Sequence, residues 1–175
     1  MPFDLEFVAF NGERYYALGK MLYIEINLQN FENMLAAINI DGIGHYSSTR
    51  NLTFFDCSEE FVNAALDLKE KYPGVIRVDP WPAGDHIHFW IRKIPSIAIS
   101  PTGTCDLFHT ADNMINLISV DKIEEVVKFV VDLVYIIADC LENTEKSGLQ
   151  GKQASQYSKY SRNFRYFKGK NLKIR

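Results

Sequence analysis

The stretch Met34–Gly44, MLAAINIDGIG, indicates the class of fold. Its apolar run ends in Asp41 and a glycine, which is the pattern of a buried strand that stops at a turn. Comparable runs follow at Leu52–Cys57 (LTFFDC) and Pro95–Ser100 (PSIAIS), with a shorter one, VIRVD, at 75–79. Near-continuous apolar strands of this kind are typical of sheets that are covered on both faces.

Helices are predicted between and after these strands. Ser58 is a candidate N-cap, with Glu59 and Glu60 in the first helical turn, and this helix should end near Tyr72, before Pro73-Gly74. A longer helix is expected to begin at Ser119 or Asp121 and to end near Asn143.

Three weaker predictions complete the list of elements. The run Leu5–Phe10 (LEFVAF) ends in Asn-Gly and suggests a further buried strand, followed by a short helix over residues 15–24. The loop PWPAGDHIHFW should open a helical turn at Asp85. Strands that alternate with helices predict an α/β fold, here a three-layer α/β/α sandwich with a mixed sheet, over residues 1–147.

Residues 148–175 form a separate basic tail in this interpretation. Eight Lys and Arg and no acidic residue lie in 152–175, which leaves 11 basic and 22 acidic residues in the first 151 and a net charge there of −11. The aromatic residues interleaved with these cations suit single-stranded nucleic acid or an anionic surface. Packing of the tail on its own acidic body, or on that of a second copy, is the preferred alternative, and a nucleic-acid partner is not expected.

Composition excludes several classes of protein. Of the 175 residues, 47% are hydrophobic and 23% are charged, which argues against disorder throughout. Even the most apolar stretch, Phe129–Leu141, is interrupted by Asp132 and Asp139, so no membrane span is expected. The amino terminus has no basic region before its apolar run, and the three cysteines are widely spaced. Both features favour a cytoplasmic protein with reduced thiols.

Candidate chemistry lies where strands end. Glu13 follows the first apolar run, Asp41 follows the second, and His109 is in the loop after Ser100. Functional sites of open α/β sheets form beyond the carboxyl ends of strands. Two carboxylates and an imidazole that converge there would suit a zinc-type hydrolytic site, although each one alone is more often an ordinary loop residue.

The order of motifs resembles one known family. FVAFNGE, NIDGIG, GDHIHFW with IPSIAIS, and HTADNM with its following helix are similar to segments of the zinc-dependent aminopeptidases, a family that includes glutamate carboxypeptidase II and the transferrin receptor. The resemblance covers residues 5–135 and only the C-terminal half of the family domain. It implies a zinc-peptidase-like α/β sandwich that lacks the N-terminal part of that domain.

The resemblance also implies roles for individual residues. Glu13 matches the general base, and Asp41 and His109 match ligands of the two zinc ions. The remaining matches have supporting or substrate-facing roles, and they are Asp85, His86 and Asp112. The implied reaction is hydrolysis of N-terminal peptide bonds by metal-activated water, with a peptide as substrate and zinc as cofactor.

Two departures weaken the implied metal centre. Arg14 stands where the family has the second acid of its Gly-Glu-Glu motif, a zinc ligand. Only twelve residues precede Glu13, so we expect no upstream His-x-Asp segment. A catalytic zinc ion normally has three protein ligands, so zinc should be weakly bound or absent. We expect Arg14 to replace part of the metal charge by pairing with a nearby acid, or else to point into solvent.

Alternative interpretations remain open for four features. His86 and His88 form an H-x-H pair that could bind a metal from a strand, and Cys105 with His109 could form a nucleophile pair. Trp81 could stack on a ligand, although buried aromatic residues usually belong to the core. The whole chain could instead be a catalytically inactive peptidase-like module for binding or assembly. A sheet edge and an apolar face left uncovered would favour self-association, as a homo-oligomer.

Overall fold

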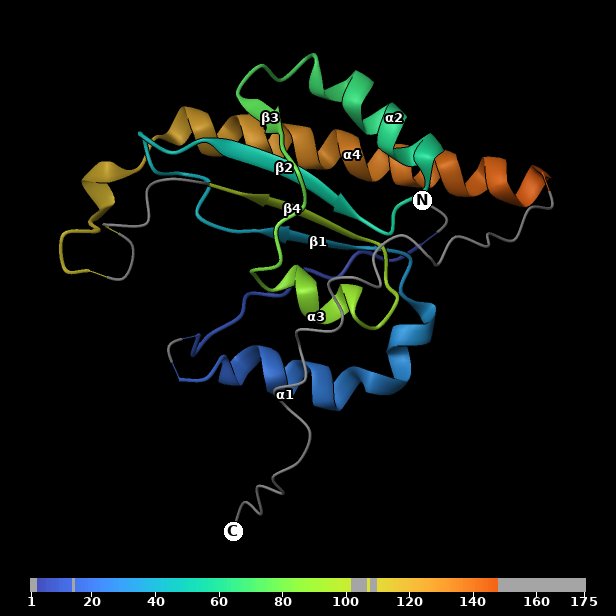
Figure 1. Cartoon of the computed structure of the whole chain (residues 1–175), viewed down its shortest axis with the longest axis horizontal. Helices are drawn as coiled ribbons and strands as arrows, with labels where there is room; N and C mark the ends of the chain where they lie inside the picture. The colour runs from blue at the N-terminus through green and yellow to red at the C-terminus, as the bar shows by residue number, and fades with distance from the viewer. Residues whose placement is uncertain (1–2, 14, 102–106, 108–109, 148–175) are drawn as a thin grey trace, which may run out of the picture.

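The computed structural model describes residues 3–13, 15–101, 107 and 110–147, with side chains as far as residue 140. A four-stranded sheet lies between two layers of helices (Figure 1). The strands are β1 (Ala37–Ile40), β2 (Arg50–Phe55), β3 (Val75–Arg77) and β4 (Ser96–Ser100). Their order is β1-β4-β2-β3, with β1 and β4 parallel, β4 and β2 antiparallel, and β2 and β3 parallel. The predicted mixed sheet is confirmed.

The helices cover both faces of this sheet. Figure 1 shows α2 (Glu59–Lys69) and α4 (Val120–Ser147) on one side, and α1 (Leu18–Asn27) and α3 (His86–Trp90) on the other. Two 3₁₀ helices, η1 (Leu28–Asn33) and η2 (Ile115–Leu117), complete the elements of the described chain. The predicted three-layer α/β/α arrangement is therefore confirmed.

The larger core lies between the sheet and the α2–α4 layer. Side chains from β2 and β4 meet side chains from both helices, and the burial of this apolar surface is the main favourable term in folding. The fully buried members are Leu52, Ala65, Ile97, Ile99, Val126, Phe129 and Leu133. Two smaller clusters fill the opposite face, one around Ile24, Phe31, Phe89 and Ile94 and the other around Phe55, Ile87, Trp90 and Ala98.

The boundaries of α2 and α4 follow from their capping residues. Ser58 accepts a hydrogen bond from the backbone N–H of Phe61 at 3.2 Å, so it is the N-cap of α2, as predicted. Ser119 precedes α4, where its side chain accepts a hydrogen bond from the N–H of Lys122 at 3.4 Å.

None of the helices in the described part of the chain combines the length and apolar character that a membrane span requires.

The predicted strand over Leu5–Phe10 is wrong. The backbone there is irregular, and the side chains of Leu5 and Phe7 are 62% and 91% exposed. Phe10 packs instead against Tyr23 of α1, with ring centroids 5.5 Å apart. An apolar run becomes a buried strand only when a neighbouring strand pairs with its backbone and helices cover its faces. Among the described residues, no strand pairs with this segment, and most of its side chains are exposed.

The predicted helix over residues 15–24 begins later than expected, as α1 at Leu18. Tyr16 and Ala17 have φ angles of 57° and 55°, a left-handed conformation that is incompatible with a continuing α-helix. Gly19 donates its N–H to the carbonyl oxygen of Asn11 at 3.0 Å. A Cβ atom at Gly19 would lie 2.3 Å from that oxygen. The absence of a side chain therefore lets the turn that carries Glu13 pack against the start of α1.

Candidate functional site

The carboxyl ends of β1 and β4 lie side by side. The two strands are parallel and pair Ile40 with Ile99, and the N–H of Asp41 donates to the carbonyl of Ile99 at 3.0 Å. Asp41 therefore begins its loop at the point where β4 is about to end at Ser100. The sequence predicted that the Asp41 loop and the loop after Ser100 leave the same edge of the sheet, and this pairing agrees with that prediction.

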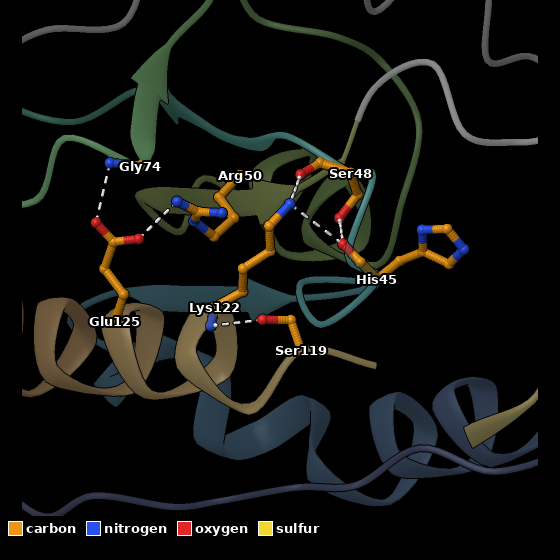
Figure 2. Close-up of polar contacts among 7 residues, drawn as sticks. All are labelled: His45, Ser48, Arg50, Gly74, Ser119, Lys122 and Glu125. Carbon is orange, nitrogen blue, oxygen red and sulfur yellow. Dashed lines mark hydrogen bonds and ion pairs between the residues drawn. The ribbon is translucent and has the colours of Figure 1, made fainter. Parts of the chain in front are cut away.

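The Asp41 loop is bonded to the start of α4. Gly44 accepts a hydrogen bond from the N–H of Ser119 at 2.7 Å, and Tyr46 donates its N–H to Leu117 at 2.8 Å. Figure 2 shows the side chain of Lys122 reaching from α4 into this loop. Its ammonium group donates to the carbonyl oxygen of Ser48 at 2.6 Å. The loop is therefore bonded both to the backbone before α4 and to a side chain of the first turn of α4.

The ammonium group of Lys122 makes the charge-assisted bonds to this loop. It also lies 3.4 Å from the carbonyl oxygen of His45, and Ser48 donates its hydroxyl to that same oxygen at 2.7 Å. Loss of solvation and the nearby charge of Arg50 lower the pKa of Lys122. A charge-assisted bond to a carbonyl is stronger than a neutral one. Lys122 therefore positions the loop that begins with Asp41.

An ion pair next to this loop connects α4 to two strands. Arg50, at the start of β2, donates to Glu125 at 2.6 Å, and the other oxygen of Glu125 accepts the N–H of Gly74 at 2.9 Å (Figure 2). A Cβ atom at Gly74 would lie 1.3 Å from the Arg50 guanidinium. Because Gly74 has no side chain, the Arg50 guanidinium can occupy the space just before β3 and pair with Glu125.

Glu13, the candidate general base, lies in the turn between Asn11 and α1. Its side chain is exposed, and its carbonyl oxygen accepts the N–H of Ala17 at 2.9 Å. Asn11 accepts the N–H of Gly12 through its side chain at 2.6 Å, so the Asn-Gly turn is closed locally. α1 begins on the left of Figure 1, the side on which β1 and β4 end. Arg14 lies outside the described residues.

Asp85 forms a half-buried ion pair on the side of the sheet that α1 and α3 cover. Its carboxylate accepts a hydrogen bond from Lys20 of α1, whose side chain is buried. This pair joins the residue before α3 to α1. The family resemblance implied a supporting or substrate-facing role for Asp85. The contact observed here is with Lys20, which was not predicted from the sequence.

His86 is the first residue of α3, and its side chain is buried against the sheet. Its ring lies 4.7 Å from the ring of Phe55 and 5.8 Å from that of Trp81, measured between centroids. Burial lowers the pKa of His86 to about 4, so the ring is neutral at neutral pH. In the neutral ring, Nε2–H donates to the Trp81 carbonyl at 3.3 Å, which leaves Nδ1 to accept from Asn39 at 3.5 Å.

The H-x-H alternative is not supported by the geometry of α3. His86 and His88 lie on a helix, where side chains two residues apart point in different directions. His86 is buried and His88 is half-buried. Trp81 belongs to the apolar cluster around Phe55, which agrees with the core interpretation of that residue.

Asp112 and His109 complete the list of predicted site residues. Asp112 is exposed in the loop before η2, and its carbonyl oxygen accepts the N–H of Met114 at 3.0 Å. His109, together with Cys105 and the basic tail, lies outside the described residues. Their predicted roles therefore stay predictions.

The described side chains do not by themselves fit a zinc centre. Nowhere in residues 3–13, 15–101, 107 and 110–140 do three or more His, Cys, Asp or Glu side chains come together in an arrangement that could hold a metal ion. A catalytic zinc ion needs three such ligands. Of the residues matched to zinc ligands, Asp41 is the one that the structure describes, and one carboxylate cannot hold the ion.

Comparisons with known proteins give the family. A search of curated proteins found no match. Among solved structures, the chain is similar to BSAP, a zinc aminopeptidase from Bacillus subtilis, at 18% sequence identity and a TM-score of 0.52. That similarity covers 67% of this chain and 32% of the Bacillus chain, so it spans about a third of the relative and shows the fold. The model of peptidase family M28 matches residues 2–134, which is most of the sequence. The chain therefore belongs to peptidase family M28.

Proposed function

We propose that this chain is a peptidase-like assembly module, which does not hydrolyse peptides on its own. The observation that carries the proposal is the ligand set of the described residues. Asp41 follows the end of β1. Among the described residues, however, it does not belong to a group of three or more side chains that could hold a metal ion. Arg14 replaces an expected ligand with a permanent cation, which would repel a metal ion at that position.

The Asp85–His86 pair supports the same proposal. Asp85 is paired with Lys20, and His86 is buried and neutral. In these positions the two side chains stabilise the packing of α1 and α3. A substrate group that binds Asp85 would compete with Lys20 for its carboxylate.

Exposed apolar side chains support the assembly part of the proposal. They line the amino-terminal segment and α1, on the side of the sheet opposite to α2 and α4 (Figure 1). Among the exposed large apolar side chains of the described residues, those on this segment, on α1 and at the start of η1 are Leu5, Phe7, Tyr15, Tyr16, Leu18, Met21, Leu22, Ile26 and Leu28. Exposed apolar side chains that gather on one side of a protein can mark an interaction site. We propose that a second copy of the chain covers this surface, with β1 as the adjacent open edge of the sheet.

Peptide hydrolysis is the second candidate function. Membership of family M28 and the position of Asp41 beside the end of β4 favour it. The reaction would be cleavage of amino-terminal peptide bonds, with Glu13 as the general base. The chain covers about a third of the aminopeptidase that it resembles, so further ligands would have to come from another polypeptide segment.

An aminopeptidase assay separates the two candidates. Purified full chain with added zinc should release nitroaniline from aminoacyl-nitroanilides no faster than the Glu13→Gln variant, which keeps the size of the side chain but lacks the base. A rate that is above that of Glu13→Gln and that falls with a zinc chelator would contradict the assembly proposal. It would establish peptide hydrolysis instead.

A further inference from the structure

Between α2 and α4, on the face away from α1, lies an open groove that the peptidase interpretation does not use. It is a shallow depression, open to solvent, with a volume of about 490 Å³. Its lining is partly apolar and partly charged, with Ala64, Asp67, Leu68, Lys71, Asp132, Tyr135 and Ile136 contributing. Tyr135 is 57% exposed, so the groove presents an aromatic side chain to solvent.

The charges around the groove are mainly negative. Asp67 and Asp132 line it, opposed by the single cation Lys71. Glu60 on α2 lies four residues before Ala64, and Asp139 on α4 lies three residues after Ile136, so both exposed acids continue the helix faces that line the groove. Burial raises the pKa of Cys140, and the charges of Glu60 and Asp139 raise it further. A ligand that fits this groove should therefore combine positive charge with aromatic or apolar side chains.

The chain carries a segment with that chemistry. The tail contains eight Lys and Arg without any acidic residue, and five aromatic residues lie in it: Tyr157, Tyr160, Phe164, Tyr166 and Phe167. It follows directly on α4, which ends at Ser147 on the same face of the sheet as the groove (Figure 1).

The reach of the chain is sufficient for this contact. Asp132 precedes Ser147 by 15 residues, which is roughly 22 Å along a helix. Tyr157 follows Ser147 by ten residues, which span up to about 33 Å when extended. The aromatic part of the tail can therefore reach the whole groove within the same molecule, and the short connection gives a high effective concentration.

We propose that the segment 152–175 of this chain docks into the groove between α2 and α4, with its cations facing Asp67, Asp132, Asp139 and Glu60 and its aromatic rings on Tyr135 and Ile136. The proposal is independent of whether the chain hydrolyses peptides.

Zero-length carbodiimide cross-linking of the full chain tests the docking. This reagent joins lysines to carboxylates that are in contact, and the tail offers lysines at 152, 159, 168, 170 and 173. Peptide mapping of an equal mixture of ordinary and heavy-nitrogen-labelled chains should find tail lysines linked to Asp67, Asp139 or Glu60, within chains of one label. Links between differently labelled chains would overturn the proposal in favour of a tail exchanged between copies.

Charge reversal supplies the matched control. The double variant Asp67→Lys/Asp139→Lys should lower the yield of links to the remaining groove carboxylates roughly tenfold, because two attractive pairs become repulsive. Glu25→Lys reverses another exposed acid, on α1, and it should leave the yield unchanged. Cross-linking of the wild-type chain in about 1 M salt, where the Debye length is roughly 3 Å, should weaken the links without any substitution. Links spread evenly over all exposed acids, or equal yields in both variants, would refute the docking.

Discussion

At the scale of single residues, the Asp-His motif of this chain stabilises packing between layers. Lys20, Asp85, His86 and Asn39 connect α1, α3 and β1 through one ion pair and the hydrogen bonds of one imidazole. Removing a partner from such a buried polar group leaves the other unsatisfied, at a cost of about 1–3 kcal/mol. Replacement of any one of these residues should therefore lower the free energy of unfolding.

The pH dependence of stability should report on His86. Its pKa is about 4 in the folded chain, below the value of 6.5 for a free histidine. The unfolded state therefore binds more protons between pH 6.5 and pH 4, and stability falls as the pH decreases through that window. The contribution reaches about 3 kcal/mol, since one pKa unit corresponds to 1.36 kcal/mol. Urea unfolding of the wild-type chain at pH 7.5 and at pH 5 measures this loss.

The His86→Gln variant isolates the contribution. Glutamine can still donate to the Trp81 carbonyl, but it does not titrate. The difference between the two pH values should therefore be smaller in the variant by about 2 kcal/mol, as expected for the 1.5 pKa units that separate pH 6.5 from pH 5. Carboxylates titrate in both proteins, so their effect cancels. An identical loss of stability in the two proteins would show that His86 is not the group responsible.

At the scale of elements, the fastening of the Asp41 loop to α4 is the main feature. Lys122 reaches two loop carbonyls, while Lys128, one turn and a half farther along the same helix, forms an exposed pair with Glu124. The two lysines thus offer the same chemical group in a half-buried and in an exposed setting.

Replacing Lys122 by Met should loosen this loop. The carbonyl of Ser48 loses its donor, so we expect a loss of about 1–3 kcal/mol in the free energy of unfolding. Amide exchange, measured by mass spectrometry, should accelerate over residues 42–48 and remain unchanged over β4. Lys128→Met, the matched control, removes an i,i+4 surface pair and should cost at most about 0.5 kcal/mol. Equal effects of the two substitutions would contradict the positioning role of Lys122.

Most elements of the fold are predictable from local patterns. The apolar runs at β1, β2, β4 and the capping serine of α2 are local signals, and each predicted an element that the structure contains. The predicted strand at Leu5–Phe10 is also an apolar run, but no strand of the described residues pairs with it. The local sequence does not show whether a pairing strand is present.

The contacts of the candidate site are less predictable, because they join distant residues. Lys20 pairs with a partner 65 positions away, and Lys122 bonds to carbonyls 74 and 77 positions away. A single sequence carries no signal for such pairs, because neither spacing nor periodicity connects them. The position of Asp41 could be predicted, since a strand, an acid and a glycine are adjacent in the sequence.

At the scale of the whole molecule, the two helical layers present different surfaces. The α2–α4 layer has the groove with its carboxylates, and the α1 layer has many of the exposed apolar side chains, although others, such as Val127 and Val131, lie on α4. Self-association through the α1 layer leaves the groove accessible to the tail, so the two proposals are compatible.

A charge on α1 should weaken self-association. Ile26 is 72% exposed, so Ile26→Glu changes the surface without opening a cavity. The dissociation constant of the dimer should rise roughly tenfold or more, equivalent to about 1.4 kcal/mol. Sedimentation velocity over a series of concentrations measures it. Val127→Glu places the same charge on the exposed face of α4 and should not change the constant. A wild-type chain that is monomeric at every concentration would refute the α1 interface.

The zinc content of the purified full chain tests the central claim, that this M28 domain does not complete a metal centre by itself. After incubation with zinc and dialysis, elemental analysis should find well under one zinc ion per chain, with the same value for the Asp41→Ala variant. One or two zinc ions per chain that survive dialysis, and that are lost in Asp41→Ala, would contradict the claim.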